Sequence, residues 1–328
     1  MGEAVAKGFR WRLDDGSEAA QGTLFGLGDV QHHVGRGEYK GLEFLHVKAV
    51  RIINQVPPSS RMPFRYTVNP YRGCSHACTY CFARPTHEYL GLGAGKDFET
   101  KVVVKVNAVE LVRAELASPR WRGDLVAMGT NTDPYQHAEG KYHLTRGIVQ
   151  ALSDARNPFS ILTKSTLVLR DLALLAEAAK RTSVRVNLSI GTLDRQVWRL
   201  TEPGTPPPDK RLEAVRRLND AGVTCGVLIA PVLPGLSSSA EQVAAVAEAC
   251  RQVGAPVAGA LALHLRPGVK EHYFSWLAEK RPDLLAMYED LFKRGPYQPK
   301  AEQQRLSAIV ERTGPPSRAH EVGLVTSL

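Results

Sequence analysis

Short apolar runs alternate with helical patterns from about residue 64 onward, and this alternation limits the possible folds more than any other feature. The segment from Leu169 to Lys180 shows the helical period, with Leu172, Leu175 and Ala179 on one stripe. Apolar runs predict six strands, at about 65–71, 124–130, 158–164, 183–191, 224–232 and 257–266. Repeated strand-helix units of this kind indicate an α/β fold with a parallel sheet.

The distribution of polar residues on the strands favours a barrel over an open, doubly wound sheet. In the fourth predicted strand, Arg185, Asn187 and Ser189 share one face, and the apolar residues between them share the other. A barrel with helices outside and a working lumen needs one apolar and one polar face, whereas a sheet covered on both sides favours two apolar faces. The sequence therefore predicts a partial (β/α)6 barrel of right-handed units.

The segments outside these units carry weaker patterns. Residues 1–62 have mixed charge, scattered glycine and no sustained periodicity, so we expect an irregular N-terminal extension. The barrel is predicted to span residues 63–280, with further helices at 208–221 and 239–252, the second capped near Ser239. Two or three helices are expected after residue 268, and residues 281–328 form the predicted C-terminal helical tail.

The composition excludes several classes of protein. With 328 residues and ordinary apolar and charged fractions, the chain is long enough to form a core without disulfides. It has no run of about 18 apolar residues and no signal-peptide pattern, so we expect a cytoplasmic protein that does not span a membrane. The net charge of +9 is dispersed, which is compatible with nucleic acid as a partner and also with none.

Three of the five cysteines lie within eight residues, directly after the first predicted strand. Cys74, Cys78 and Cys81 form a CxxxCxxC pattern, in a loop that a barrel places at its active face. An odd number of cysteines in this arrangement is a poor disulfide framework and favours metal chemistry. Cys225 begins the fifth strand and Cys250 lies on a predicted helix, so we interpret both as buried thiols.

Two kinds of metal centre are compatible with the clustered cysteines. In a [4Fe–4S] cluster each cysteine holds one iron, so three cysteines leave one iron open to a small molecule. The alternative is a structural zinc site with His76 or His87 as the fourth ligand. The remaining interpretation is that the three cysteines are unrelated free thiols. Three thiols within eight residues argue against it, because exposed thiolates so close together are liable to oxidise.

The CxxxCxxC pattern, with Tyr80 just before its last cysteine, resembles that of the radical S-adenosylmethionine (radical SAM) superfamily. The chain also resembles the spore photoproduct lyase-like branch of that superfamily in three runs: Asn-Pro-Tyr-Arg-Gly-Cys at 69–74, Thr-Asp-Pro-Tyr-Gln at 132–136 and Thr-Lys-Ser at 163–165. The resemblance covers roughly residues 66–276. The residues before it are similar to those of uncharacterised relatives in this branch.

This resemblance implies a partial barrel, a [4Fe–4S] cluster and S-adenosylmethionine as cofactors, and lyase-like or other hydrogen-abstraction chemistry. The open iron is expected to bind the amino and carboxylate groups of S-adenosylmethionine, and an electron from the cluster to cleave the sulfonium. The resulting 5′-deoxyadenosyl radical is expected to abstract hydrogen from a substrate in a cavity that excludes water. A flavodoxin- or ferredoxin-type electron donor is implied as a partner.

The resemblance also implies which residues hold S-adenosylmethionine. Lys164 and Ser189 match strand-end positions that contact the cofactor, the lysine as a partner for its carboxylate; a solvated surface cation is the alternative for Lys164. Tyr80 is expected beside the adenine, and the Ala230 backbone matches the position that brackets it. The superfamily's Gly-Gly-Glu-like segment has a different sequence here, and the candidate polar contacts are Thr130, Asn131, Thr132 and Asp133. An Asp-Pro turn that needs no ligand is the alternative for Asp133.

Candidate substrate contacts are His264 and Arg266 on the sixth strand, with Tyr135, Arg199 and Glu202 as weaker candidates. A satisfied core pair is the alternative for His264 and Arg266. Spore photoproduct lyase has a cysteine hydrogen donor in the region that corresponds to residues 130–136, where this chain has none. That difference argues against repair of the same lesion by the same route.

Two functions therefore compete on the sequence. The first is a radical SAM enzyme whose substrate is open among nucleic acid, protein and small molecules. The second is a non-catalytic nucleic-acid-binding protein, in which the +9 charge contacts phosphates and the cysteines hold structural zinc.

Overall fold

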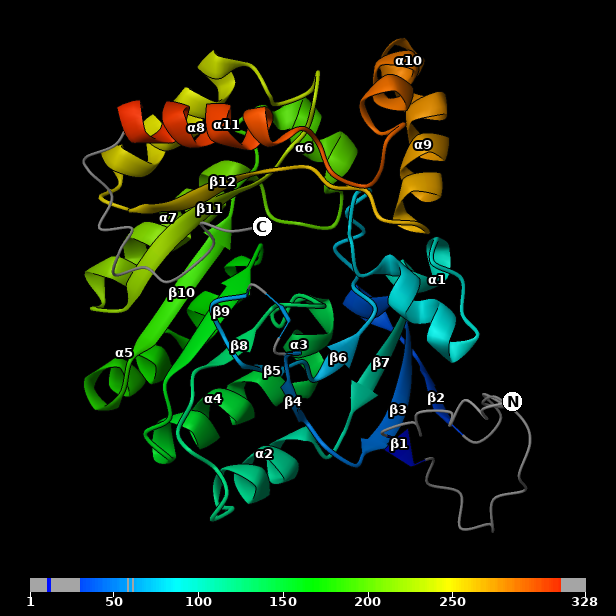
Figure 1. Cartoon of the computed structure of the whole chain (residues 1–328). Coiled ribbons are helices and arrows are strands. Elements are labelled where there is room, and N and C mark those ends of the chain that lie inside the picture. Colours follow the sequence, from blue (N-terminus) through cyan, green and yellow to red (C-terminus); the bar gives the residue numbers. More distant parts are fainter. Residues whose placement is uncertain (1–10, 13–29, 58, 61, 314–328) are drawn as a thin grey trace.

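A seven-stranded sheet forms the centre of the computed structural model, which describes residues 11–12, 30–57, 59–60 and 62–313 (Figure 1). Its strand order is β12 (Val257–Ala262), β11 (Thr224–Val232), β10 (Val184–Ser189), β9 (Phe159–Thr163), β8 (Val126–Met128), β5 (Tyr66–Val68) and β4 (Ile53–Gln55). The first six pair in parallel, and β4 is antiparallel to β5 at the edge. All six predicted strands are confirmed, and the fold is the predicted α/β partial barrel.

Amphipathic helices cover the outer face of this sheet (Figure 1). They are α4 (Leu144–Asp154), α5 (Leu172–Arg181), α7 (Pro208–Asp220) and α8 (Ala240–Gln252), and α2 (Ala108–Leu116) packs beside α4. The predicted cap of α8 is confirmed, because the Ser239 side chain accepts from the Gln242 backbone within a capping box. The apolar face of β10, including Val186 and Leu188, is buried with these helices in one core. The polar face of β10, which includes Ser189, faces the interior of the barrel.

A second, smaller sheet corrects the prediction of an irregular N-terminal extension. It contains β1 (Trp11–Arg12), β3 (Glu43–Ala49), β7 (Lys101–Lys105) and β6 (Tyr71–Arg72), with β2 (Gln31–Val34) paired to β3. Strand β3 pairs in parallel with β7, and its Phe44 joins the same core as Val186. The sequence pattern misses these strands because they do not belong to strand-helix units, and β3 finds its partner far along the chain. Residues 1–10 and 13–29 of the predicted extension lie outside the described residues.

The connection from β5 to β8 is longer than the other crossovers because it contributes to the smaller sheet. It passes through β6, the 3-10 helix η3 (Arg84–Leu90), α1 (Lys96–Thr100), β7 and α2. Shorter helices lie in the later connections, namely α3 (His137–Tyr142), η4 (Thr166–Asp171) and α6 (Arg195–Thr201). Another short helix, η2 (Gly37–Tyr39), lies earlier in the chain, before β3. The cysteine pattern falls between β6 and η3, at the carboxyl end of β5.

Three helices after residue 268 confirm the expectation for the C-terminal region: α9 (Val269–Lys280), α10 (Pro282–Leu291) and α11 (Lys300–Thr313). Tyr273 and Tyr288 pack α9 against α10, while α11 lies on β12 and α8 (Figure 1). Residues 314–328 of the predicted tail lie outside the described part. The division into domains at residues 62 and 280 stays a prediction. In the described residues, no helix has the length and apolar character that a membrane crossing requires.

Candidate active site

Cys74, Cys78 and Cys81 line one cavity of about 220 Å³ at the carboxyl ends of the parallel strands. Polar residues at or just after the carboxyl ends of β8, β9 and β10 line the same space, among them Lys164 and Ser189. The sequence placed the cysteine loop and these strand ends at one face of a barrel, and the structure brings them together there.

The cysteine loop is held by backbone and side-chain hydrogen bonds from several distant segments. The Cys74 N–H donates to the Phe98 carbonyl at 2.8 Å, and the Thr79 N–H donates to the Thr201 carbonyl at 3.0 Å. Arg84, which is 0% exposed, donates from its guanidinium to the carbonyl of Cys78 at 2.8 Å. The same guanidinium donates to the carbonyls of residues 94 and 95 at 3.1 and 3.2 Å and pairs with Glu99. Arg84 thus ties the cysteine loop to the glycine-containing segment after η3.

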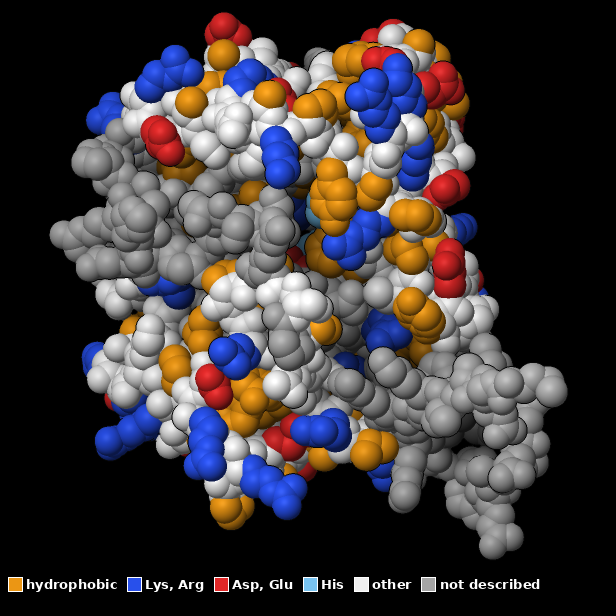
Figure 2. Space-filling model, in the orientation of Figure 1, with side chains coloured by type: hydrophobic (Ala, Val, Ile, Leu, Met, Phe, Trp, Pro, Cys, Tyr) orange, Lys and Arg blue, Asp and Glu red, His pale blue; other side chains and the backbone are white. Residues whose placement is uncertain are grey.

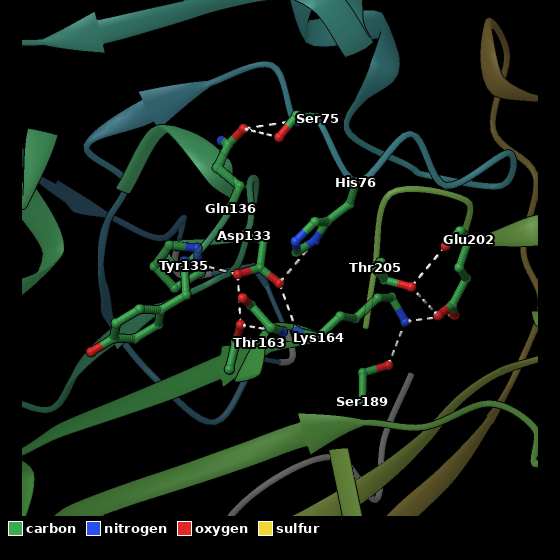
Figure 3. A network of polar contacts seen from close by, with 12 residues as sticks. Ser75, His76, Asp133, Tyr135, Gln136, Thr163, Lys164, Ser189, Glu202 and Thr205 are labelled. Atoms are coloured by element: carbon green, nitrogen blue, oxygen red, sulfur yellow. Dashed lines mark hydrogen bonds and ion pairs between the residues drawn. The ribbon is translucent and has the colours of Figure 1, made fainter. Parts of the chain in front are cut away.

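Gln136, the last residue of the Thr-Asp-Pro-Tyr-Gln run, supports the start of the same loop (Figure 3). Its side-chain nitrogen donates to the Gly73 carbonyl at 2.8 Å, and its oxygen accepts from the Ser75 N–H at 3.0 Å. Gln136 is 0% exposed. Sequence reasoning gave neither residue a role: Gln136 stood only as the last residue of a matching run, and Arg84 has no meaning until its backbone partners are known.

A glycine on the opposite side allows a very close approach to the loop. Gly204 donates its N–H to the His76 carbonyl at 3.0 Å. A Cβ atom at this position would lie 2.2 Å from the Ser75 carbonyl oxygen, which is well inside van der Waals contact. The segment after α6 therefore packs directly on the cysteine loop only because residue 204 has no side chain.

The chemistry of the three thiols fits an iron–sulfur cluster. Burial raises the pKa of Cys74 and Cys78 well above the usual value, with Asp133 adding to the effect at Cys74 and Glu202 at Cys78, and burial also raises the pKa of Cys81. The free thiols therefore keep their protons and release them only when a metal binds. Among the described residues, no three or more His, Cys, Asp or Glu side chains converge to hold a single metal ion. A four-iron cluster does not need that convergence, since each thiolate binds a different iron.

Lys164 lies at the centre of a polar cluster (Figure 3) and lines the same cavity as the three cysteines. Its ammonium donates to Ser189 Oγ at 2.6 Å and to the Ala230 carbonyl at 3.3 Å, and it pairs with Glu202 Oε1 at 3.1 Å. Ser189 Oγ in turn donates to the Ala230 carbonyl at 2.6 Å. The Lys164 ammonium also lies 5.6 Å from the centroid of the Tyr80 ring. An ammonium has three donors, so all three are engaged inside the protein.

Glu202 links this cluster to a second cation that the sequence did not single out. Its carboxylate accepts from the Tyr80 hydroxyl and forms a buried ion pair with Arg211, which also donates to the Ser189 carbonyl at 2.9 Å. Burial alone would raise the pKa of Glu202, but the charges of Arg211 and Lys164 outweigh it and lower the pKa to about 2. Glu202 is therefore ionised at neutral pH. Through its contacts with Lys164 and Tyr80, its carboxylate positions both side chains.

The Asp133 carboxylate is satisfied by its own chain (Figure 3). It accepts from the Tyr135 N–H at 2.9 Å, the Thr163 hydroxyl at 2.6 Å and the Lys164 N–H at 2.6 Å, and His76 Nδ1 lies 3.4 Å away. Burial would raise the pKa of Asp133, yet His76 and these hydrogen bonds hold it below its usual value. Only the contact with Tyr135 belongs to a local turn; the other contacts join Asp133 to the end of β9 and, through His76, to the cysteine loop.

The remaining residues of the segment after β8 point in different directions. Thr132 lines the first cavity and donates to the Tyr71 carbonyl at 3.0 Å, whereas Thr130 lines a second cavity. Tyr135 is 0% exposed, does not line the first cavity, and donates from its hydroxyl to Asp171 at 3.1 Å. Figure 3 shows its ring pointing away from Lys164. The expectation that Tyr135 contacts substrate is therefore wrong in this structure, because its ring belongs to the core behind the site.

Aromatic side chains gather where the chain leaves β12. His264 lines the first cavity, and its ring lies 6.2 Å from that of Phe82 and 5.6 Å from that of Tyr297. Burial and the neighbouring Arg266 lower the pKa of His264, so its imidazole is neutral at neutral pH. Arg266, the other candidate substrate contact on this strand, is exposed, donates to the Tyr297 hydroxyl at 3.2 Å and does not line the first cavity. Strand β12 ends at Ala262, before the predicted alternation reaches Arg266.

The two histidines considered as zinc ligands have other contacts. His76 is turned toward Asp133, while Nε2 of His87 lies 2.9 Å from the Lys101 carbonyl oxygen, and the His87 ring packs on Phe98. Arg199, a weaker substrate candidate, is exposed on α6. Lys and Arg side chains are scattered over the face seen in Figure 2, in agreement with the dispersed charge of the sequence.

A parallel α/β partial barrel with a three-cysteine loop at the carboxyl ends of its strands defines a recognisable class of protein. The family model described as the radical SAM superfamily matches residues 68–247. The chain belongs to this superfamily.

Relatives and solved structures agree with this assignment. The chain is 46% identical to an uncharacterized protein of Mycobacterium tuberculosis, over 85% of this chain and 81% of that protein. It is 32% identical to an uncharacterized protein of Methanocaldococcus jannaschii, over 60% of this chain and 70% of the relative. In fold the chain is similar to the solved structure of spore photoproduct lyase complexed with dinucleoside spore photoproduct, with a TM-score of 0.60. The two sequences are 18% identical, and the match covers 82% of this chain and 78% of the other.

Proposed function

We propose that this protein is a radical SAM enzyme that binds a [4Fe–4S] cluster through Cys74, Cys78 and Cys81. When reduced and bound, such a cluster supplies the electron that cleaves S-adenosylmethionine to a 5′-deoxyadenosyl radical, which abstracts hydrogen from a substrate. The observation that carries the proposal is that the three cysteines share one cavity with Lys164 and Ser189. A flavodoxin- or ferredoxin-type protein is the proposed source of the electron.

The chain's own residues have separable tasks in this proposal. Lys164 presents a positive charge toward the carboxylate of S-adenosylmethionine, and Ser189 and the Ala230 carbonyl hold the ammonium in place. Glu202 and Arg211 fix the position of Lys164 from behind. Tyr80 is 7% exposed and packs its ring against the lysine, in the region proposed for the adenine. Thr132 is proposed to contribute a polar contact and Asp133 to position the segment, whereas Thr130 faces the second cavity.

The partly enclosed and mainly apolar cavity suits radical chemistry. A primary carbon radical attacks almost any C–H bond, so it must form where water and stray hydrogen donors are excluded. The first cavity is lined by apolar side chains of β11 and β12 as well as by the polar cluster, and the cysteine loop lies across it. His264, at the edge near Phe82, remains our candidate for contact with the substrate.

The decisive experiment is anaerobic reconstitution with iron and sulfide, reduction with dithionite, and chromatographic assay for 5′-deoxyadenosine from added S-adenosylmethionine. We expect a brown protein with absorbance near 400 nm that forms the product. The variant with Cys74, Cys78 and Cys81 all changed to Ala should contain no cluster and form none. The matched control is Cys225→Ala together with Cys250→Ala, since both thiols lie in the core outside the cavity and should be dispensable for iron binding.

The competing function predicts a different result. A non-catalytic nucleic-acid-binding protein with structural zinc would contain zinc after anaerobic purification and form no 5′-deoxyadenosine after reconstitution. Iron content in the triple-cysteine variant equal to that of the wild type would overturn the assignment of the ligands.

A further inference from the structure

Three aromatic rings form a row that leads from the first cavity to the surface. Phe82 directly follows Cys81, His264 follows β12, and Tyr297 lies in the connection between α10 and α11, beside the chain that leaves β12 (Figure 1). The His264 ring lies 6.2 Å from the Phe82 ring and 5.6 Å from the Tyr297 ring, at interplanar angles of 33° and 24°. Phe82 and His264 line the first cavity, whereas Tyr297 does not. The row therefore begins at the cavity wall and ends outside it.

The two outer rings of the row leave apolar surface open to solvent. Phe82 is 46% exposed and Tyr297 is 55% exposed. A single exposed aromatic side chain is ordinary in a folded protein, but exposed apolar side chains that gather beside one another and border a cavity indicate a binding site. Because the rings are flat and close to parallel, the surface that they form suits a ligand with a flat ring of its own.

The outer end of the row is held in place by the backbone. His264 and Tyr297 form an antiparallel β-bridge, and the Gln298 side chain donates to the Leu263 carbonyl at 2.9 Å. These contacts fix the connection that carries Tyr297 to the chain after β12. The rings are therefore positioned before any ligand arrives, which lowers the entropic cost of binding.

An arginine lies at the outer edge of the row. Arg266 is exposed, and its guanidinium donates to the Tyr297 hydroxyl at 3.2 Å. A guanidinium has five N–H donors, and no carboxylate among the described residues forms an ion pair with Arg266. Donors therefore remain for acceptor atoms on the rim of a ring that lies on the row.

We propose that Phe82, His264 and Tyr297 bind a planar aromatic ring of the substrate by stacking, with Arg266 as a donor to acceptor atoms on that ring. This inference rests on the proposed radical SAM function and names the substrate class as molecules that carry a planar aromatic ring. Stacking on aromatic side chains is a general means of holding nucleobases and other flat rings. Because Phe82 and His264 line the first cavity, the groups attached to the bound ring lie in the space that the cysteines and Lys164 also line.

Two matched pairs of probes test whether the site selects a flat ring. Uridine and 5,6-dihydrouridine carry the same polar groups, but only uridine has a planar base; N-acetyltryptophanamide and N-acetylleucinamide are the corresponding amino-acid pair. Each probe is added to the full-length, cluster-reconstituted, unreduced protein saturated with S-adenosylmethionine, so that the adenine of the cofactor already occupies its own place. Anaerobic equilibrium dialysis measures the affinities. We expect the planar member of at least one pair to bind at least about five-fold more tightly than its partner.

Substitutions of the two exposed rings provide a second test. Phe82→Leu and Tyr297→Leu keep an apolar side chain but remove the ring, so each should weaken binding of the preferred planar probe at least about three-fold. Phe82→Tyr and Tyr297→Phe keep a ring and should retain the affinity. Tyr89→Leu is the matched control, because Tyr89 is 65% exposed on η3 and lines neither cavity. Iron content is measured in every variant because Phe82 adjoins a cluster ligand, and Tyr297→Leu tests the site from outside the cavity.

The possible outcomes are distinct. A preference for uridine indicates a nucleobase-type substrate, and a preference for N-acetyltryptophanamide indicates an aromatic amino-acid side chain; both support the site. No preference in either pair, or unchanged affinity in both leucine variants, overturns it and leaves the rings as packing for the connection after α10. Formation of 5′-deoxyadenosine by the wild type is measured separately. Product without a ring preference defeats only the stacking site, and a ring preference without product defeats only the proposed reaction.

Discussion

The Lys164 ammonium lies 3.1 Å from Glu202 Oε1, so the cation proposed to meet S-adenosylmethionine already has a buried counter-charge. Glu202 comes from the segment after α6 and Lys164 from the end of β9, and their side chains are only 6% and 14% exposed. The Arg211 guanidinium pairs with the other oxygen of the same carboxylate. The network holds Lys164 in one position before any ligand arrives, which lowers the entropic cost of binding.

Replacement of the lysine tests its role in binding. Lys164→Ala should weaken binding of S-adenosylmethionine by about 1.5–3 kcal/mol, or roughly 10- to 150-fold, because the ammonium, which exchanges one of its internal partners for the cofactor carboxylate, no longer supplies a charged hydrogen bond. Glu202 keeps Arg211 and the Tyr80 hydroxyl as partners, so the fold should persist. Anaerobic equilibrium dialysis with reconstituted protein measures the affinity, with Lys210→Ala on the surface of α7 as control. Equal affinity in the Lys164 variant would show that the lysine does not bind the cofactor.

The pH dependence of stability tests the charge of Glu202. Its pKa is lowered to about 2 in the folded protein, against about 4.3 for an unfolded glutamate, so the folded state binds fewer protons between these values. The stabilisation by Glu202 is therefore complete above about pH 4.3 and is lost as the pH falls toward 2.

Glu202→Gln should accordingly lower the free energy of unfolding by about 3–5 kcal/mol at pH 7, because Arg211 loses a buried counter-charge. The difference from wild type should be the same at pH 5 and should shrink below pH 4. Urea unfolding of the apoprotein at pH 7, 5 and 3.5 gives these values. Glu213→Gln, at an exposed position on α7, is the control. A difference that vanishes by pH 5 would contradict the lowered pKa.

Arg84 is expected to matter for the cluster although it touches no metal. Arg84→Met removes the buried donors to the carbonyl of Cys78 and to the glycine-containing segment, each worth about 1.5–3 kcal/mol as a charged hydrogen bond. Iron bound per chain after reconstitution should fall to less than half, together with the melting temperature. Arg216→Met, which removes an exposed ion-paired arginine from α7, should change neither. Full iron content in the Arg84 variant would show that the loop keeps its shape without this anchor.

Gly204 provides a steric test of the same loop. Gly204→Ala places a Cβ atom 2.2 Å from the Ser75 carbonyl oxygen, so the backbone must shift at a cost of about 1–3 kcal/mol. We expect reduced iron loading and a lower melting temperature. Gly93→Ala is a suitable control, because the nearest atom to its added Cβ is the flexible Asp97 carboxylate at 3.5 Å. Identical behaviour of the two variants would show that the loop accommodates the extra methyl group.

The sequence by itself determined the six parallel strands, the helices between them and the cysteine loop at their carboxyl ends. These features are local: an apolar run, a helical stripe or a CxxxCxxC pattern is complete within a few residues. Ser189 was assigned to the polar face of its strand for the same reason, because side chains alternate along a strand.

Tertiary structure alone decided the rest. It decided four features: the pairing of β3 with β7, the anchoring of Cys78 by Arg84, the Glu202–Arg211 pair and the cavity beside Asn131. Each joins residues that are separated along the chain or that gain meaning only from a neighbour's carbonyl. Arg266 was misjudged for a related reason. A side chain's direction at the end of a strand depends on where the strand stops and on what packs against it, and no sequence period records either.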